Sequence, residues 1–311
     1  MIIEKKKKGN VIEYIVDKDY GDDKLEKVLT QKLMPSQIKN IINHDADVYT
    51  KEGKLLLRFR KNKLQKDNID AFYENVIKFA ENTTQNRGTA SGSKSKNIYD
   101  NPKVKSNILG YFDKLTPGQK FIFKKNGMPL PKITVRETRF LTNFPEKYKK
   151  LLPLIKQIDK YYEEYIPEPY KKQRRKANQT HFKINGTSFT TITTNVNYQT
   201  AVHTDKGDDE EGFGNLAVIE HGKYKGAETC FPQYGIGVDV RTGDILYMDV
   251  HQPHGNLPLV LESPDAKRLS IVCYLRKSIW EQTKGKTQKF KEKHNKTLKK
   301  NLLRKEKLHF E

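Results

Sequence analysis

The chain has 311 residues, of which 35% are hydrophobic, and its 59 Lys and Arg against 38 Asp and Glu give a formal net charge of +21. No apolar run approaches the roughly 18 residues of a membrane-spanning helix, and no apolar signal segment follows the basic N-terminus, so we expect an intracellular protein without a membrane partner. The charge excess favours a polyanionic partner, usually nucleic acid, although a lysine-rich proteome would account for part of it.

The first 85 residues are expected to form an α/β extension. The segment "KLLLRFRK" (54–61) has the texture of a strand, and "NIDAFYENVIKFAEN" (68–82) places apolar residues at helical spacing behind Asn68, a plausible cap. The polar stretch "TTQNRGTASGSKSKN" (83–97) is a loop by composition.

A second helical pattern begins at residue 144 and is stopped by "IPEP", after which comes the basic cluster "KKQRRK" (171–176). From about residue 181 to 280, Thr, Val, Ile and Tyr alternate between glycines, which is typical of strands. We therefore expect an α+β chain with a β-rich core domain over 86–280. Residues 281–311 predict a basic tail, helical or disordered, that either binds phosphates without reading bases or is simply solvated.

The stretch "TAVHTD" (200–205) places a histidine and an aspartate two residues apart. If a strand continues through it, His203 and Asp205 share one face with the polar residues Asn195 and Asn197, as in a pocket wall. Two histidines and one carboxylate on a metal leave three positions open, the arrangement of non-haem Fe(II) oxygenases. The simpler alternative is a polar strand end on the surface.

The third ligand is expected at the start of a later strand, in "RTGDILYMDVHQPHGNLPLV" (241–260). His251 and His254 compete for this position. His254 is preferred because it directly precedes the next expected strand, whereas His251 ends the previous one and could face the substrate instead.

The segment "AKRLSIVCYLR" (266–276) reads as a strand in which Arg268 and Ser270 share a face and Lys267 points away. A guanidinium with a hydroxyl two residues on forms a fork for a carboxylate. The far carboxylate of 2-oxoglutarate is such a group, so this pair, with Asn197, is the expected co-substrate site.

These motifs occur in one order, from "TSFTTITTNVNYQTAVHTD" to "RLSIVCYLR", with "NRGTASG" and "SNILGYFD" upstream. Over about residues 86–280 the chain resembles the TET/JBP family of Fe(II)- and 2-oxoglutarate-dependent nucleic-acid dioxygenases. It is nearer the base-J thymine hydroxylases and their viral and phage relatives than the animal enzymes, whose cysteine-rich zinc region two cysteines cannot form.

The resemblance implies a double-stranded β-helix (a jelly-roll, cupin-like core) with flanking helices. His203, Asp205 and His254 match the iron ligands, and Arg268 with Ser270 matches the co-substrate site. The implied reaction uses O2 to hydroxylate the 5-methyl group of thymine or 5-methylcytosine after the base flips out of duplex DNA. Such a protein would be nuclear in a eukaryotic host.

Two further residues are candidates for substrate binding. Asp208 lies where the family has a polar residue near the base, so its carboxylate could accept an N–H from that base, or it could cap a turn. Arg87 is an upstream arginine expected to reach the pocket. Two other functions stay open: a 2-oxoglutarate-dependent hydroxylase of RNA or protein, and a non-catalytic nucleic-acid-binding jelly-roll.

Overall fold

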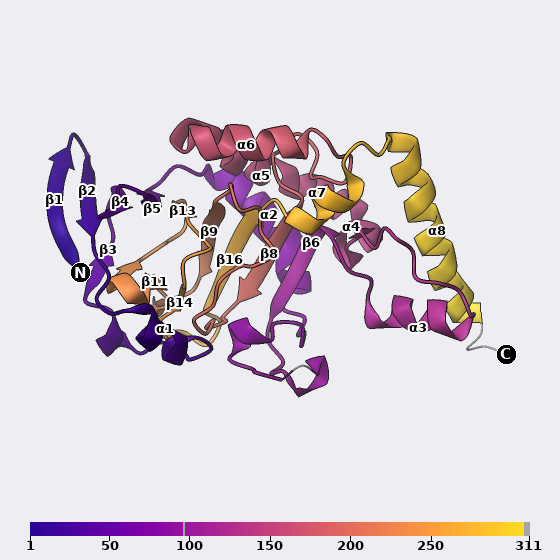
Figure 1. Ribbon diagram of the computed structural model, residues 1–311, viewed down its shortest axis with the longest axis horizontal. Helices are drawn as coiled ribbons and strands as arrows, with labels where there is room; N and C mark the ends of the chain where they lie inside the picture. The colour runs from indigo at the N-terminus through magenta and orange to yellow at the C-terminus, as the bar shows by residue number, and fades with distance from the viewer. Residues whose placement is uncertain (96, 308–311) are drawn as a thin grey trace.

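The computed structural model describes residues 1–95 and 97–307. A large sheet of ten strands runs through its centre (Figure 1). Neighbouring strands are antiparallel except β2 and β4, which are parallel. In spatial order the strands are β1 (Ile2–Lys8), β2 (Val11–Val16), β4 (Ala46–Thr50), β5 (Leu55–Arg60), β13 (Ile245–Met248), β9 (Gly214–His221), β16 (Lys267–Tyr274), β8 (Thr191–Val196), β6 (Ser106–Phe112) and β7 (Arg136–Glu137).

A smaller sheet lies against one face of the large one. It is made of β14 (Gly255–Asn256), β11 (Thr229–Phe231), β12 (Ile236–Val238) and β3 (Asn40–Ile42), and a separate pair joins β10 (Tyr224–Gly226) to β15 (Leu259–Leu261). The helices are α1 (Asp22–Val28), α2 (Lys66–Ala80), α3 (Pro117–Lys125), α4 (Arg139–Asn143), α5 (Pro145–Tyr165), α6 (Pro167–Ala177), α7 (Lys277–Thr283) and α8 (Gln288–Lys307).

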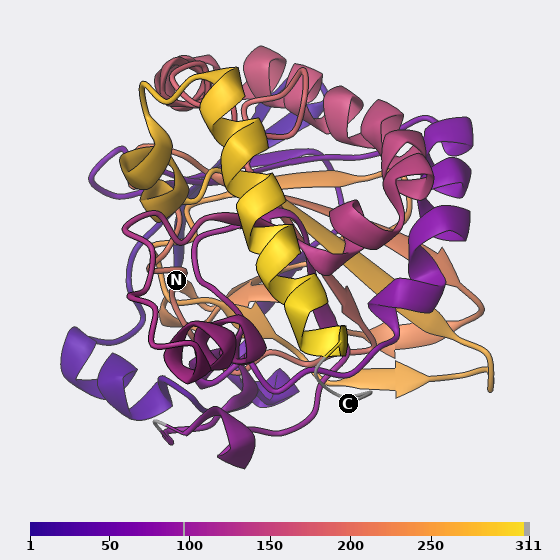
Figure 2. The same ribbon diagram turned by 90° about the vertical axis from the view of Figure 1, so that its right-hand side faces the viewer.

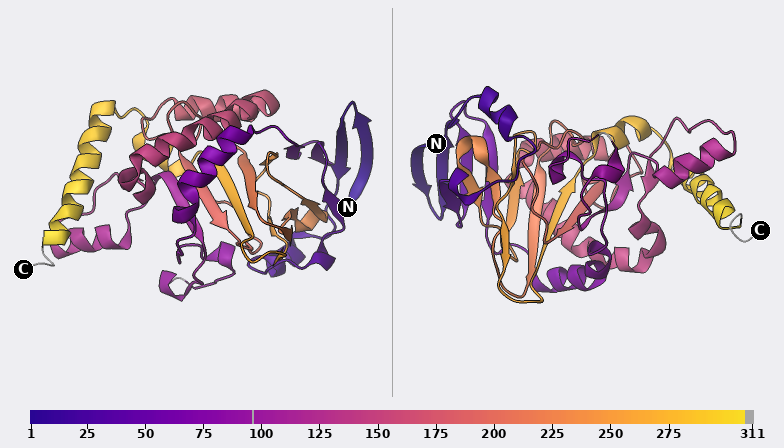
Figure 3. Two further views of the ribbon diagram at one scale, coloured as in Figure 1. Left: turned by 180° about the vertical axis from the view of Figure 1, so that it is seen from behind. Right: turned by 90° about the horizontal axis from the view of Figure 1, so that it is seen from below.

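The alternation of side chains along the central strands produces two cores. On β9, Ala217 and Ile219 pack against α2 and α5, whereas Leu216 and Val218 pack against the small sheet. Seen from behind, α2 and α5 lie side by side across the sheet (Figure 3). The molecule is therefore layered as helices, large sheet and small sheet. This mixture of helices with mainly antiparallel sheets agrees with the α+β class expected from the sequence.

The N-terminal extension expected over residues 1–85 contributes strands to both sheets. β5, predicted from "KLLLRFRK", pairs with β13, and β3 pairs with β12. The helix predicted over 68–82 is α2, but it begins at Lys66, two residues early. Asn68 is consequently inside the helix and not its cap, and its Nδ2 donates to Gln157 Oε1 (3.0 Å).

The "IPEP" segment ends α5 as predicted, but it also begins α6. Ile166 leaves the helical region (φ −129°, ψ 59°) because the following proline disfavours helical backbone there. Pro167 then occupies the first helical position, where its missing N–H costs nothing. The basic cluster 171–176 therefore lies on a helix.

The tail predicted over 281–311 is largely helical and docked. Leu298 of α8 packs with Phe123 of α3, and His294 Nε2 lies 2.7 Å from the carbonyl of Val135. Figure 2 shows α8 running across one side of the molecule with α3 beside it. Residues 308–311 lie outside the described part of the chain. Within that part, no helix has the length and apolarity to cross a membrane.

Candidate active site

The strand expected to carry His203 and Asp205 ends earlier than predicted. β8 stops at Val196, and Asn197 has a left-handed backbone (φ 48°), which asparagine tolerates better than most residues. Its side chain is taken up by the neighbouring strand, because Nδ2 donates to the carbonyl of Ala266 (2.9 Å) and Oδ1 accepts from Arg268 N–H (2.7 Å). The prediction that residues 195–205 share one strand face is therefore wrong.

His203, Asp205 and His254 nevertheless converge. His203 and His254 exchange both backbone hydrogen bonds, each 2.9 Å long, and Asp205 N–H donates to the carbonyl of Val250 (3.0 Å). Gly255 sits where a Cβ would come within 3.3 Å of the backbone of Ala201. The close backbone approach of these two segments, and not strand alternation, brings the three side chains together.

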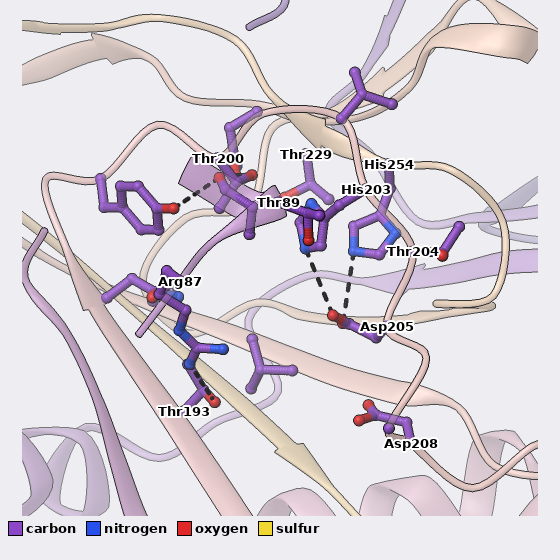
Figure 4. Close-up of a pocket in the computed structure, with 18 of the residues that line it drawn as sticks. Arg87, Thr89, Thr193, Thr200, His203, Thr204, Asp205, Asp208, Thr229 and His254 are labelled. Carbon is purple, nitrogen blue, oxygen red and sulfur yellow. Dashed lines mark hydrogen bonds and ion pairs between the residues drawn. The ribbon is translucent and has the colours of Figure 1, made fainter. Parts of the chain in front are cut away.

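The three side chains present their donor atoms to one point (Figure 4). One carboxylate oxygen of Asp205 lies 3.5 Å from His203 Nε2, and the other lies 3.7 Å from His254 Nε2. The Nδ1 atoms face the carbonyls of Ala201 (2.8 Å) and Gln252 (2.9 Å). When neutral, each imidazole therefore donates through Nδ1 and leaves the Nε2 lone pair for a metal, which is how metal-binding histidines are held.

Burial and mutual interactions shift the pKa values of these three side chains. Burial and the charge of His203 lower the pKa of His254 to about 4, so this imidazole is neutral. Burial alone would lower the pKa of His203, but its hydrogen bond to Asp205 outweighs burial and the pKa is raised. Burial would raise the pKa of Asp205, but the two histidines hold it below its usual range.

One potential ligand atom from each residue lies within 4.8 Å of the other two, and the two-histidine, one-carboxylate set fits a divalent ion such as Fe(II). His251 is not part of this group. Its Nε2 lies 3.2 Å from the carbonyl of Asp209. The preference for His254 over His251 agrees with this geometry.

A cavity of about 400 Å³ opens beside the three side chains, between the two sheets and the loop that follows α2. The structure brings seven of the eight predicted site residues to its wall: Arg87, His203, Asp205, Asp208, His254, Arg268 and Ser270. Asn197 does not line it, because its amide is bonded to the backbone of β16.

Arg268 is a buried cation at the cavity wall. It is 4% exposed, burial lowers its pKa, and no carboxylate of the described residues lies within 4.0 Å of its guanidinium. A buried charge without a counter-ion is costly. Arg268 is therefore suited to an anionic ligand such as a carboxylate, and Ser270 lies beside it on the same strand face.

Asp208 and Arg87 lie at other parts of the wall. Burial and the charge of Asp205 raise the pKa of Asp208 well above its usual value. Arg87 Nε donates to Ser106 Oγ (2.7 Å) and Nη2 donates to Thr193 Oγ1 (2.9 Å; Figure 4). Both residues therefore present a polar group to whatever enters the cavity.

The wall residues that sequence reasoning missed include Tyr274 and Arg276. Arg276 is held by a 2.6 Å ion pair with Asp113. The sequence could have indicated both residues, because they lie at even spacing from Arg268 and Ser270 and so continue the same face of the strand.

Residues 121–277, just over half of the chain, match the family model Tet_JBP, described as the oxygenase domain of the 2OGFeDO superfamily. The bifunctional helicase and thymine dioxygenase JBP2 of Leishmania braziliensis is 36% identical over 170 residues, which are 54% of this chain and 14% of that protein. The thymine dioxygenase JBP1 of Trypanosoma brucei brucei is 31% identical over 179 residues, which are 57% of this chain and 20% of that protein. The chain thus spans about a seventh to a fifth of the length of these relatives.

The solved structure of NgTET1 in complex with 5mC DNA superposes with a TM-score of 0.52 at 13% identity, covering 85% of this chain and 94% of that one. At this identity the likeness concerns the fold alone. With the family match and the convergence of the three side chains, it leads to one conclusion: the chain belongs to the Tet/JBP family of oxygenase domains in the 2OGFeDO superfamily.

Proposed function

We propose that this protein hydroxylates the 5-methyl group of thymine in DNA, using Fe(II), 2-oxoglutarate and O2. The observation that carries the proposal is a single cavity that holds two histidines and a carboxylate around one point together with Arg268, a buried guanidinium. Membership of the family implies the metal and the co-substrate.

The proposed core is a double-stranded β-helix. The strands β8, β16, β9 and β13 would form its larger sheet, and β14, β11 and β12 its smaller one. The apolar cluster between the two sheets and the cavity at its end support this assignment, since such barrels hold their ligands between the sheets.

In this proposal His203, Asp205 and His254 bind the iron through Nε2 and carboxylate oxygens. Arg268 and Ser270 hold the far carboxylate of 2-oxoglutarate, which fixes its orientation relative to the metal. When bound, the iron, 2-oxoglutarate and O2 supply the oxidising power that a methyl C–H bond requires.

Thymine is proposed because the curated relatives named above are thymine dioxygenases. The base would flip out of the duplex to reach the cavity. Asp208 and Arg87 would contact its polar edge, since both line the cavity. The proposed partner is therefore duplex DNA. In a eukaryotic host, a protein that acts on this DNA would be nuclear.

Contacts to the DNA backbone are assigned to the lysines of α3 and α8. The basic cluster 171–176 is a less suitable candidate, because Lys171, Lys172, Arg174 and Lys176 each lie within 4.0 Å of an acidic residue of the same chain. The exposed lysines of α8 belong to none of the described ion pairs, so they are better placed to bind phosphates.

Nucleoside mass spectrometry tests the proposal. The protein would be incubated with Fe(II) and 2-oxoglutarate on DNA that contains thymine only, and on matched DNA that also contains 5-methylcytosine. We expect 5-hydroxymethyluracil from both, with Asp205→Ala as the inactive control. Hydroxymethylation confined to 5-methylcytosine would correct the substrate. Modification of neither, by protein that binds iron and 2-oxoglutarate, would refute DNA hydroxylation and direct the search to RNA or protein.

A further inference from the structure

Three polar side chains face one another on neighbouring strands, and two of them, Asn195 and Ser270, line the cavity. Asn195 of β8 is paired in register with Ser106 of β6 on one side and with Ser270 of β16 on the other. Ser106 Oγ lies 2.6 Å from Asn195 Oδ1, and Asn195 Nδ2 lies 3.2 Å from Ser270 Oγ. These residues form a polar row (Ser106, Asn195, Ser270) that runs across three strands.

Arg87 gives the polar row a direction. Its Nε–H can only donate, and it donates to Ser106 Oγ (2.7 Å). The hydroxyl hydrogen of Ser106 is then directed to Asn195 Oδ1, which turns the amide nitrogen of Asn195 toward Ser270. Each hydrogen bond along the row thus fixes the orientation of the next group.

The row ends at the hydroxyl of Ser270, whose hydrogen has no acceptor among the described residues. Ser270 Oγ accepts from Asn195, and no described residue accepts a hydrogen bond from Ser270 in return. Ser270 is 5% exposed and lines the cavity with Arg268, two residues earlier on the same strand. Its hydrogen is therefore available to a ligand beside that guanidinium.

We propose that Asn195 is a positioning residue that holds the Ser270 hydroxyl as a donor toward the far carboxylate of 2-oxoglutarate. The inference rests on the proposed function for the identity of this co-substrate. If the amide of Asn195 were reversed, its oxygen would attract the Ser270 hydrogen, and a lone pair of Ser270 would face the carboxylate. A donor that is oriented before the ligand arrives saves the cost of reorientation on binding.

The test is calorimetric titration of the Mn(II)-loaded protein, in the absence of DNA, with 2-oxoglutarate and with 2-oxobutyrate. The second ligand keeps the oxo-acid end and lacks the far carboxylate. We expect Asn195→Leu, which has a similar volume, to weaken 2-oxoglutarate binding about three- to tenfold, as loss of one hydrogen bond does. Binding of 2-oxobutyrate should change by less than about twofold.

Ser270→Ala shows whether Asn195 acts through Ser270. If it does, Asn195→Leu adds little in the Ser270→Ala background, because the group that it orients is gone. Thr191→Val is the matched control. Thr191 lies on the same strand and is buried, but its hydroxyl donates to the carbonyl of Tyr111 (2.9 Å) and contacts neither Arg87 nor the polar row. It should leave 2-oxoglutarate binding unchanged.

The inference would be overturned if Asn195→Leu lowered the affinities for 2-oxoglutarate and 2-oxobutyrate equally. It would also be overturned if the double variant lost affinity by the product of the two single losses. Asn195→Ala is the second variant should the leucine protein not fold. It removes the donor to Ser270 without adding a charge, so it should also weaken 2-oxoglutarate binding selectively. Wild-type protein that fails to bind 2-oxoglutarate would contradict the proposed function, whereas binding that Asn195 does not influence would contradict this inference alone.

Discussion

The two histidines at 251 and 254 differ in what holds their imidazoles. His254 Nδ1 lies 2.9 Å from a carbonyl of the same turn, which leaves Nε2 facing Asp205. His251 instead directs Nε2 to the carbonyl of Asp209. The same residue type, three positions apart, is therefore a potential ligand in one case and a structural contact in the other.

Replacement of each histidine by glutamine should separate these roles. His254→Gln is expected to weaken Mn(II) binding by at least about 100-fold, because a ligand is removed outright. His251→Gln, the matched control, should change it by less than about threefold. Calorimetric titration of the two variants and the wild type measures this, and equal losses of affinity would mean that His251 also contacts the metal.

The pKa directions at the metal centre predict how metal binding depends on pH. The raised pKa of His203 means that this imidazole keeps its proton to a higher pH than a free imidazole does, and the metal must displace that proton. His254, with a pKa of about 4, is already neutral. Mn(II) affinity should therefore rise about tenfold per pH unit from pH ~5 until the pKa of His203 is passed, and then level off. A slope of two protons per metal would show that both histidines titrate in this range.

At the scale of elements, the acidic segment after Asp205 is held by lysines from two helices. Lys176 of α6 lies 2.5 Å from Asp209 and 2.8 Å from Glu211, and Lys277, at the start of α7, lies 2.6 Å from Glu210. Asp209 is buried, with 2% of its side chain exposed. Lys176, in the basic cluster on α6, thus stabilises the position of the segment that follows Asp205 and Asp208.

Two lysines of α6 should differ in their effect on stability. Lys176→Met leaves the buried Asp209 carboxylate without its cation, so it should lower the free energy of unfolding by about 2 kcal/mol. Lys172, which is 56% exposed and pairs with Glu211, should cost less than about 0.5 kcal/mol when replaced by Met. Urea denaturation of the metal-free proteins provides the measurement. Comparable decreases would mean that burial of Asp209 does not decide the effect.

At the scale of the whole molecule, lysines gather at two opposite ends. The β1 strand lies at one end and α8 at the other (Figure 1). On α8, Lys289, Lys293 and Lys296 are exposed, and on β1 Lys5, Lys6 and Lys7 are exposed. Both groups contribute equally to the net charge. Removing one or the other therefore distinguishes a local contact with phosphates from the general attraction of a basic protein for DNA.

Changing three lysines to glutamine at each end tests the proposed DNA-binding side. The α8 triple variant should weaken DNA binding and reduce the slope of log affinity against log salt by up to about 2.7, or about 0.9 for each phosphate that a lysine no longer neutralises. The β1 triple variant should change that slope by less than about 1. Affinity for 2-oxoglutarate should be the same in both. Equal changes at the two ends would indicate long-range attraction only.

The sequence by itself determined the chemistry and most of the regular elements. The spacing of apolar residues predicted α2, β5 and the strand β16, because periodicity is a local property. The order of the polar motifs in the sequence also indicated the two histidines, the carboxylate and the arginine with its neighbouring serine. Together these residue types favour a site for a metal and an anion, so they could be identified without coordinates.

Only the tertiary structure decided how these residues meet. The backbone pairing of His203 with His254 and the turn at Asn197 depend on segments about fifty or more residues apart in the chain. The same is true of the row from Ser106 through Asn195 to Ser270, which exists only because three distant strands pair in one register. Pairing between strands is a non-local choice, so alternation within one strand could indicate which face a residue lies on but not which side chains lie opposite it.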